Sequence, residues 1–133
     1  MKKISIVTSC FNEEDNINVL YKKLIDIINK LSNKYSFEIL FIDNASTDFT
    51  QDELKKIAKE DSRVKIIVNS RNFGNIKSSY YGICQASGDA VIYMASDLQD
   101  PPELIYDFVE NWEKGCEVVI ARKYDSRKFS FFD

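Results

Sequence analysis

The sequence has no histidine and only three cysteines, and these absences exclude several kinds of chemistry. Without histidine, the chain has no Ser-His-Asp or Cys-His catalytic group, no histidine general base and no histidine-ligated zinc. Cys10, Cys84 and Cys116 are odd in number, far apart and never in a CxxC pair, which argues against a disulfide framework and a zinc ribbon. A reducing, cytoplasmic setting fits this cysteine usage best.

Glycine, proline and long apolar runs are also scarce. The 133 residues include four glycines and two prolines, and 44% are hydrophobic, so a disordered chain is not expected. The longest apolar runs, such as residues 39–42, are too short to cross a bilayer, and the first residues lack the apolar region of a signal peptide. A net charge of −3 disfavours nucleic acid as a partner. We expect one domain over residues 1–133 that works with carboxylate, amide, hydroxyl and backbone groups.

Hydrophobic patterning alternates between strand and helix along the chain. Apolar runs rich in β-branched residues predict strands at 4–8, 37–42, 64–68, 90–94 and 117–121. Apolar positions at three- and four-residue spacing predict helices at 13–33, 48–60, 75–86 and 101–114. In the third helix, Ile76, Tyr80 and Ile83 share one side. This order predicts an α/β fold with a doubly wound, mostly parallel sheet.

Polar segments follow four of the predicted strands, at residues 8–13, 43–48, 69–74 and 96–103. In a parallel sheet the carboxyl ends of the strands lie at one edge, where ligands bind. The last segment places Asp97, Gln99 and Asp100 ahead of a helix that starts with proline. Such oxygen ligands suit Mg²⁺ or Mn²⁺, and a divalent ion held there could also bind a diphosphate. Each segment also has a simpler interpretation as a helix cap, a turn or a solvated charge.

Taken in order, these segments resemble family 2 glycosyltransferases of the GT-A fold, and among them most closely the polyprenyl- and dolichyl-phosphate sugar transferases. The matching pieces are Ser9-Cys-Phe-Asn-Glu-Glu14, Ile42-Asp-Asn-Ala-Ser-Thr-Asp48, Arg71-Asn-Phe-Gly74, Gly88-Asp89 and Asp97-Leu-Gln-Asp-Pro-Pro-Glu103. The resemblance implies a Rossmann-like nucleotide-diphospho-sugar transferase fold. It also implies that this chain is the donor-binding part of a truncated domain, with the acceptor-binding part missing after about residue 122.

The resemblance assigns roles to single residues. It implies that Phe11 and Glu13 lie near the nucleoside, that Asp43 hydrogen-bonds the nucleobase, and that Asp97 and Gln99 coordinate Mg²⁺ or Mn²⁺. The donor contacts that it implies are Ser9, Phe11, Glu13, Asp43, Arg71, Ser96, Asp97 and Arg122. The resemblance assigns no catalytic base within this chain.

Two positions depart from the family pattern. Ala95 stands where the first aspartate of the DXD metal motif is expected, so the site has one carboxylate fewer and its metal affinity should depend more on the donor. Ser9 stands where proline is usual, which should matter less because the backbone carries that contact.

The resemblance implies a hexosyltransferase that binds a UDP- or GDP-linked sugar. In a complete enzyme, the sugar would pass with inversion to a polyprenyl phosphate or a saccharide during synthesis of cell-envelope polysaccharide. Membrane association is expected only through a C-terminal part beyond this chain, which places a full-length protein at the cytoplasmic face of the membrane. Two alternatives stay open: a non-catalytic nucleotide-binding fragment or degenerate relative, in keeping with Ala95, and a receiver-like signalling domain, which gives residues 97–103 no role.

Overall fold

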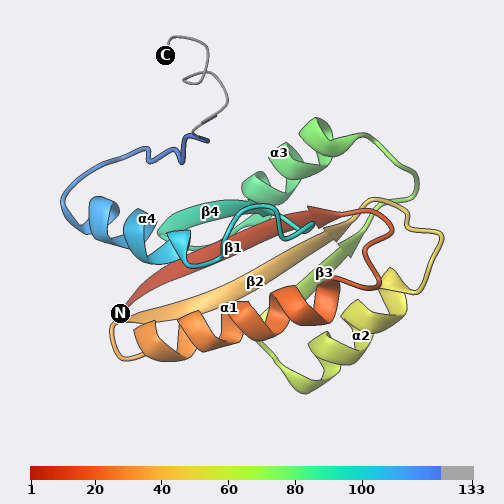
Figure 1. The fold of residues 1–133 in the computed structure, drawn as a ribbon, viewed down its shortest axis with the longest axis horizontal. Helices are drawn as coiled ribbons and strands as arrows, with labels where there is room; N and C mark the ends of the chain where they lie inside the picture. Colours follow the sequence, from red (N-terminus) through yellow and green to blue (C-terminus); the bar gives the residue numbers. More distant parts are fainter. Residues whose placement is uncertain (124–133) are drawn as a thin grey trace, which may run out of the picture.

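The computed structural model describes residues 1–123 and contains a parallel sheet with helices on both faces (Figure 1). Its strands are β1 (Lys2–Cys10), β2 (Tyr35–Asp43), β3 (Val64–Val68) and β4 (Ala90–Ala95). They alternate with the helices α1 (Ile17–Leu31), α2 (Thr50–Glu60), α3 (Asn75–Gln85) and α4 (Leu104–Glu113). Every strand pair is parallel, in the order β3-β2-β1-β4. The predicted doubly wound α/β fold is confirmed.

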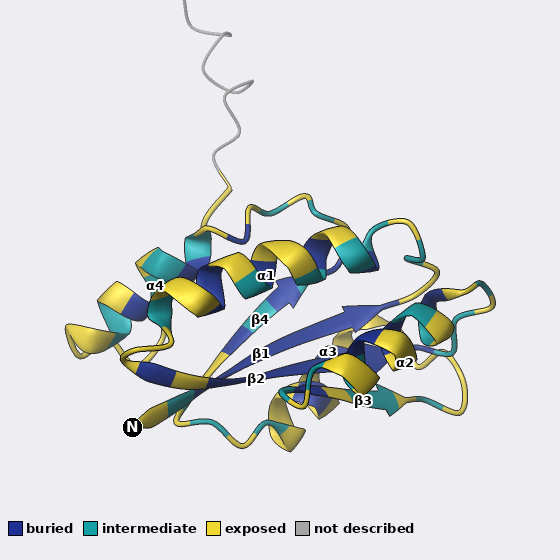
Figure 2. Cartoon of the chain, turned by 90° about the horizontal axis from the view of Figure 1, so that it is seen from below, coloured by how far each residue is buried: buried dark blue, intermediate teal, exposed yellow. Residues whose placement is uncertain are grey.

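The sheet is buried on both faces because residues of each strand alternate between two cores. Ile4 and Ile6 of β1 belong to the larger core, which lies under α1, α2 and α4. Val7 packs with Leu40 and Ile42 in a smaller core on the face that α3 covers. Figure 2 shows the two central strands almost entirely buried, which explains their nearly continuous apolar sequences.

Three helices begin later than the sequence pattern predicts, and one of them is α4, which begins at Leu104 rather than at residue 101. Helix α1 begins at Ile17 rather than near residue 13, and α2 begins at Thr50 rather than at residue 48. The intervening polar residues form side-chain hydrogen bonds to backbone groups, which compete with helix formation. None of the helices in residues 1–123 has the length and apolar content needed to cross a membrane.

The predicted fifth strand at residues 117–121 is wrong. This segment has no regular secondary structure, and Val118 and Ile120 are 77% and 82% exposed. A β-branched run favours a strand only when a neighbouring strand supplies its ladder, and within the described residues the segment forms no ladder with β4. Residues 124–133 of the predicted single domain lie outside the described part of the chain.

Candidate functional site

A cavity of about 400 Å³ opens at the carboxyl ends of the strands, between β1 and β4. The direction of chain progression reverses here, because α3 carries the chain from β3 at one edge of the sheet to β4 at the other. A reversal of this kind leaves a crevice in which ligands of open α/β sheets bind. The cavity is lined by Ser9, Cys10, Phe11, Glu13, Asn44, Asn72, Gly74, Asn75, Tyr93, Ala95, Ser96 and Asp97.

Side chains from the loops after β1 and β2 fasten these loops to each other. The Thr47 N–H donates to Asn12 Oδ1 at 2.8 Å, and the Glu13 N–H donates to Thr50 Oγ1 at 2.8 Å. The Phe49 N–H donates to a carboxylate oxygen of Glu14 at 2.9 Å. The polar sequence therefore holds residues 11–13 at the mouth of the cavity instead of continuing α1 towards β1.

Asn44 fixes the loop between β3 and α3. Its side-chain oxygen accepts hydrogen bonds from the Phe73 N–H at 2.9 Å and from Ser78 Oγ at 3.0 Å. Its side-chain nitrogen donates to Asn72 Oδ1 at 2.9 Å. Because Asn44 is only 5% exposed, these bonds form where water competes little. They set the position of Gly74, whose φ of 83° turns the chain into α3.

A second polar cluster joins β1, β4 and α3 in the wall of the cavity. Ser9 Oγ donates to Asn75 Oδ1 at 2.7 Å, and it lies 2.9 Å from the Tyr93 hydroxyl and 3.2 Å from Ser79 Oγ. The Tyr93 hydroxyl also donates to Asn75 Oδ1, at 3.3 Å. Since Asn75 Oδ1 faces three hydroxyls, the third being Ser79 Oγ at 3.4 Å, the amide nitrogen of Asn75 is left as a donor for a ligand.

The loops around the cavity contain strained backbone. Among residues 1–123, three residues other than glycine have positive φ: Asn12 at 50°, Ala45 at 61° and Leu98 at 62°. They follow the ends of β1, β2 and β4 in turn. Leucine and alanine rarely adopt this conformation, and such residues concentrate at functional sites.

Asp97 and Gln99 follow β4, and both are exposed. One oxygen of Asp97 accepts a hydrogen bond from the Gln99 N–H at 3.2 Å, which leaves the other oxygen for a ligand. Residues 1–123 contain no group of three or more acidic, cysteine or histidine side chains that could hold a metal ion. The two oxygen-bearing side chains fit a partial ligand set for Mg²⁺ or Mn²⁺, whose remaining positions would be filled by water and a diphosphate.

The structure brings together most of the donor contacts expected from the sequence. Five of them line the cavity: Ser9, Phe11, Glu13, Ser96 and Asp97. Three do not line it. Asp43 is fully buried, and its carboxylate accepts hydrogen bonds from the Ser46 N–H at 3.0 Å and from the Gln51 side chain at 2.8 Å.

The two arginines expected at the site also lie outside the cavity lining. The Arg71 guanidinium lies over the Phe73 ring, 4.5 Å from its centre. Arg122 is exposed and follows the irregular segment after α4. The neighbouring Lys123 reaches Asp100 at 3.5 Å, so this segment returns to the loop after β4.

Sequence reasoning missed several polar residues of the lining. Asn44 and Asn72 belong to segments that the sequence singles out, but nothing in their spacing marks them as hydrogen-bonding partners. Asn75 follows Gly74 directly, and its place at the start of a helix is the one signal that points to it. Tyr93 is two residues from the end of β4, where alternation aims its side chain at the α3 face.

Cys10 is not suited to act as a nucleophile, although it lines the cavity. Burial raises the pKa of its thiol, and the carboxylates of Asp43 and Glu13 raise it further. Burial would raise the pKa of the Asp48 carboxyl, but the hydrogen bonds that it accepts, mainly from Thr50, together lower this pKa. The chemistry of this site therefore rests on carboxylates, amides and hydroxyls.

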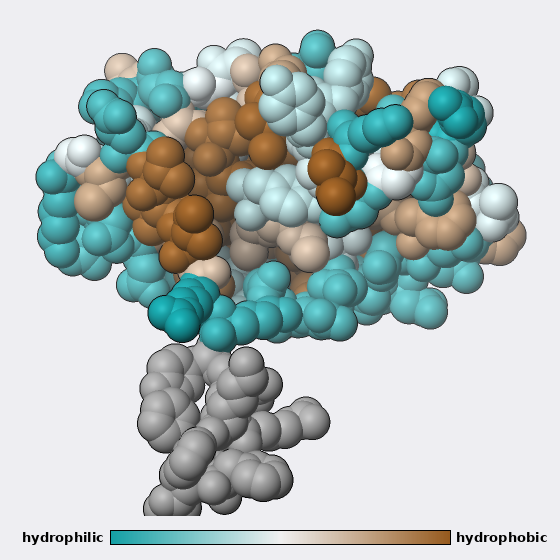
Figure 3. Space-filling model, turned by 90° about the horizontal axis from the view of Figure 1, so that it is seen from above, coloured by the Kyte–Doolittle hydropathy of each residue, from teal (hydrophilic) through white to brown (hydrophobic). Residues whose placement is uncertain are grey.

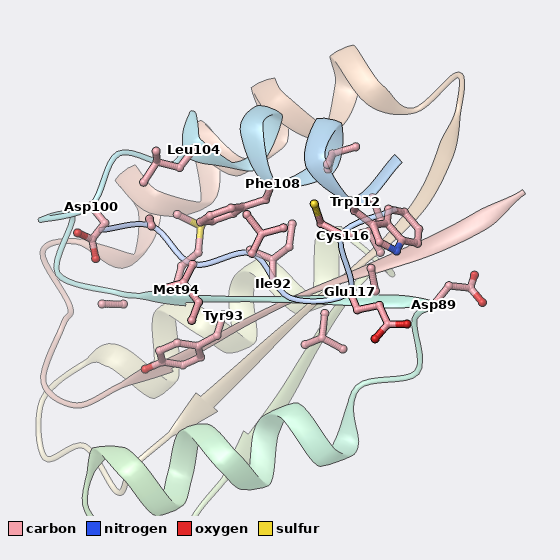
Figure 4. Close-up of a pocket in the computed structure, with 18 residues that line it drawn as sticks. Asp89, Ile92, Tyr93, Met94, Asp100, Leu104, Phe108, Trp112, Cys116 and Glu117 are labelled. Carbon is pink, nitrogen blue, oxygen red and sulfur yellow. The ribbon is translucent and has the colours of Figure 1, made fainter. Parts of the chain in front are cut away.

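A larger cavity of about 620 Å³ runs along the open edge of β4. Seen from the side of α3, hydrophobic side chains gather around a hollow in the surface (Figure 3). Figure 4 shows Ile92, Met94, Leu104 and Phe108 between β4 and α4. Although this cavity is larger, its lining is mainly apolar. The convergent polar groups and strained loops mark the cavity at the strand ends as the candidate site.

Comparison with known proteins gives a consistent result. The family model described as "Glycosyl transferase family 2" matches residues 5–132. The bactoprenol glucosyl transferase of Shigella phage SfV is 39% identical over 123 residues, which make up 92% of this chain and 39% of that protein. The chain spans less than half the length of the curated relatives that it matches.

Solved structures show the same fold. Glucosyl-3-phosphoglycerate synthase from Mycobacterium tuberculosis, in complex with Mn²⁺, UDP and phosphoglyceric acid, is 25% identical with a TM-score of 0.59, covering 87% of this chain and 40% of that one. A mannosyltransferase from Pyrobaculum calidifontis, in complex with GDP-Man and Mn²⁺, is 19% identical with a TM-score of 0.57, covering 75% of this chain and 33% of that one. The sheet described above is therefore the one that GT-A glycosyltransferases use.

Proposed function

This chain belongs to glycosyl transferase family 2, and we propose that its cavity binds the nucleoside diphosphate of a UDP- or GDP-linked sugar together with Mg²⁺ or Mn²⁺. The observation that carries this proposal is the cavity at the switch between β1 and β4, where Ser9, Phe11, Glu13, Ser96 and Asp97 converge. The Mn²⁺ complexes of the two structural neighbours, one with UDP and one with GDP-Man, support it.

Each side chain has a task that follows from its chemistry. Phe11 is 43% exposed and offers an aromatic face to a base. One oxygen of Glu13 accepts from the Asn16 side chain at 2.7 Å, and the other is available to hydroxyl or N–H groups of a nucleoside. The amide nitrogen of Asn75 is placed to donate to an oxygen of the donor. Asp43 orders the loop by accepting from the Ser46 N–H, and its hydrogen bond to the base stays a prediction.

Asp97 and Gln99 would hold the divalent ion beside the diphosphate. When bound, such an ion supplies Lewis-acid stabilisation of the negative charge that develops on the leaving group. Because Ala95 has no carboxylate, Asp97 is the one acidic ligand beside Gln99. The ion should therefore bind tightly only when the diphosphate completes its coordination shell. Donor and metal binding should then be strongly coupled.

We infer that a complete enzyme would transfer a hexose to a polyprenyl phosphate, with inversion. The name of the bactoprenol glucosyl transferase, 39% identical, supports this class of acceptor. A phosphate is already ionised near neutral pH, so it needs little help from a base. The second candidate function is nucleotide binding without transfer. It is favoured by the single acidic ligand at Asp97.

Calorimetric titration tests the binding step. UDP and GDP are titrated into the chain with Mn²⁺ and then with EDTA, and one of them should bind only with the metal. Asp97→Ala should abolish that binding while the far-UV circular dichroism stays unchanged. Asp26→Ala, an exposed carboxylate on α1, is the matched control. Equal binding of donor and Mn²⁺ by Asp97→Ala would refute the metal assignment.

A transfer assay separates the two candidate functions. UDP-glucose or GDP-mannose is incubated with Mn²⁺ and undecaprenyl phosphate, and release of UDP or GDP is measured. Release that requires Asp97 identifies an enzyme. Nucleotide binding without release identifies a binding domain.

A further inference from the structure

Helix α3 packs against the sheet with its smallest residues. Ser78, Ser79 and Gly82 are the buried residues of this helix. A Cβ added to Gly82 would lie 2.3 Å from Ile42 Cδ1 and 2.9 Å from Val7 Cγ1, so the helix backbone lies directly on the sheet. A surface helix usually buries its large apolar residues and exposes its small polar ones. In α3 the arrangement is reversed.

The large apolar residues of α3 face outward. Ile76 is 85% exposed, Tyr80 69% and Ile83 39%, at positions i, i+4 and i+7 of one helical side. Tyr81, 49% exposed, flanks them. The sequence correctly places Ile76, Tyr80 and Ile83 on one side, but that side faces away from the sheet. We call these four residues the outer stripe of α3. Figure 3 views the molecule from the side on which α3 lies in Figure 1.

All charged residues in this part of the chain are basic. Residues 62–88 contain four basic residues and no aspartate or glutamate, although the whole chain has a net charge of −3. Arg63 and Lys65 are paired with carboxylates. Among residues 1–123, no ion pair engages Arg71 or Lys77, which lie just before and on α3. An apolar, aromatic stripe is therefore flanked by cations that are available to an external anion.

We propose that the outer stripe of α3, together with Arg71, Phe73 and Lys77, is a docking surface for an anionic lipid bilayer. Apolar and aromatic side chains insert at the level of the headgroups, and basic residues are attracted to anionic lipids. A second copy of the chain fits less well, because a symmetric contact would bring like charges of two identical surfaces together.

The position of α3 links this surface to the candidate site. The helix begins at Asn75, which lines the cavity, and Ile76 is the next residue. A bilayer in contact with the outer stripe would lie beside the mouth of the cavity. This link rests on the proposed function. With a sugar donor in the cavity, a lipid phosphate would reach it without leaving the membrane surface.

Vesicle sedimentation tests the docking surface directly. The 133-residue chain is centrifuged with vesicles of phosphatidylcholine alone or of equal parts phosphatidylcholine and phosphatidylglycerol. We expect it to pellet with the anionic vesicles only, and less so as salt is raised, because salt screens the attraction. Pelleting that is absent, or equal for both lipids, would overturn the proposal.

Variants localise the contact. The double change Ile76→Ser and Tyr80→Ser should abolish pelleting, and Lys77→Gln should weaken it about fivefold. Val19→Ser and Lys22→Gln change exposed residues of α1 on the opposite face, and they should pellet like wild type. Circular dichroism confirms that each variant folds. Unchanged pelleting by the double variant would refute the assignment to α3.

Three further outcomes separate this inference from its alternatives. A dimer that forms without lipid and is lost in the double variant would show that a second copy covers the stripe, and would overturn the inference. UDP binding without vesicle binding would leave the proposed function standing and overturn the docking surface. Vesicle binding without binding of either UDP or GDP would do the reverse.

Discussion

At the scale of single residues, the candidate site depends on side chains that hold one another in place. Asn75 shows this most clearly, because the hydroxyls of Ser9, Ser79 and Tyr93 donate to its side-chain oxygen and so fix its orientation. The sequence locates Ser9, Phe11, Glu13, Ser96 and Asp97 at the cavity through the resemblance. It could not locate Asn75. The orientation of the Asn75 amide depends on a hydrogen bond from Tyr93, which lies 18 residues later in the chain.

We expect Asn75→Ala to weaken donor binding about tenfold, since loss of one hydrogen bond to a charged oxygen costs about 1.5 kcal/mol. The half-buried Asn111→Ala serves as an amide control, because within residues 1–123 its side chain bonds to the Asp107 carbonyl of its own helix. Titration calorimetry with UDP or GDP and Mn²⁺ measures the effect. A change as small as that of the control would show that Asn75 does not contact the donor.

Asp61 makes the stability of the fold depend on pH in the acidic range. The Arg63 side chain donates two hydrogen bonds to its carboxylate, at 2.9 and 2.8 Å, and the Tyr21 hydroxyl donates a third at 2.8 Å. The hydrogen bonds from Arg63 are the largest influence on the Asp61 carboxyl and outweigh the opposing effect of burial. They lower its pKa from 3.8 to about 2. This carboxylate therefore stabilises the fold above about pH 4, and its contribution is lost as the pH falls from about 4 to 2.

Asp61→Asn should lower the free energy of unfolding by about 2 kcal/mol at neutral pH, and this difference from wild type should shrink as the pH approaches 2. Urea denaturation of both proteins across that range measures it. A deficit that stays constant with pH would mean that packing, rather than the charge of Asp61, sets the cost.

At the scale of elements, the sheet was predictable and the loops were not. The apolar runs of β1 and β2 predict buried strands, because a strand covered on both faces needs an almost continuous apolar sequence. The late start of α1 depends on Asn12 bonding to Thr47, 35 residues away, which no local pattern records. Residues 117–121 have strand propensity, but they pair with no strand in the described part of the chain.

The close approach of α3 to the sheet predicts a specific sensitivity. Gly82→Ala would place a methyl group within 3 Å of Ile42 and Val7, which are both fully buried. The crowding should outweigh the higher helix propensity of alanine and destabilise the chain by about 1–3 kcal/mol. Cys84→Ala, an exposed change on the same helix, is the control. Thermal unfolding of both variants measures the effect. If Gly82→Ala were as stable as wild type, the close packing of α3 on the sheet would be refuted.

At the scale of the whole molecule, the two faces of the sheet differ in what they contain. The face under α1, α2 and α4 holds the larger hydrophobic core. The face under α3 holds the smaller core and the polar cluster of Ser9, Asn75, Ser79 and Tyr93. One face of the sheet thus carries most of the hydrophobic core, and the other carries the polar cluster of the candidate site. The cavity lies at the carboxyl ends of the strands.

Nuclear magnetic resonance can map directly where the nucleotide and the metal ion bind on this chain. Amide spectra of the labelled chain are recorded with UDP or GDP and Mg²⁺, after which a trace of Mn²⁺ replaces part of the Mg²⁺. We expect shifts at residues 9–13, 72–75 and 95–97, with paramagnetic broadening strongest at Asp97 and Gln99. Broadening centred elsewhere, such as on the acidic residues of α2, would contradict this assignment.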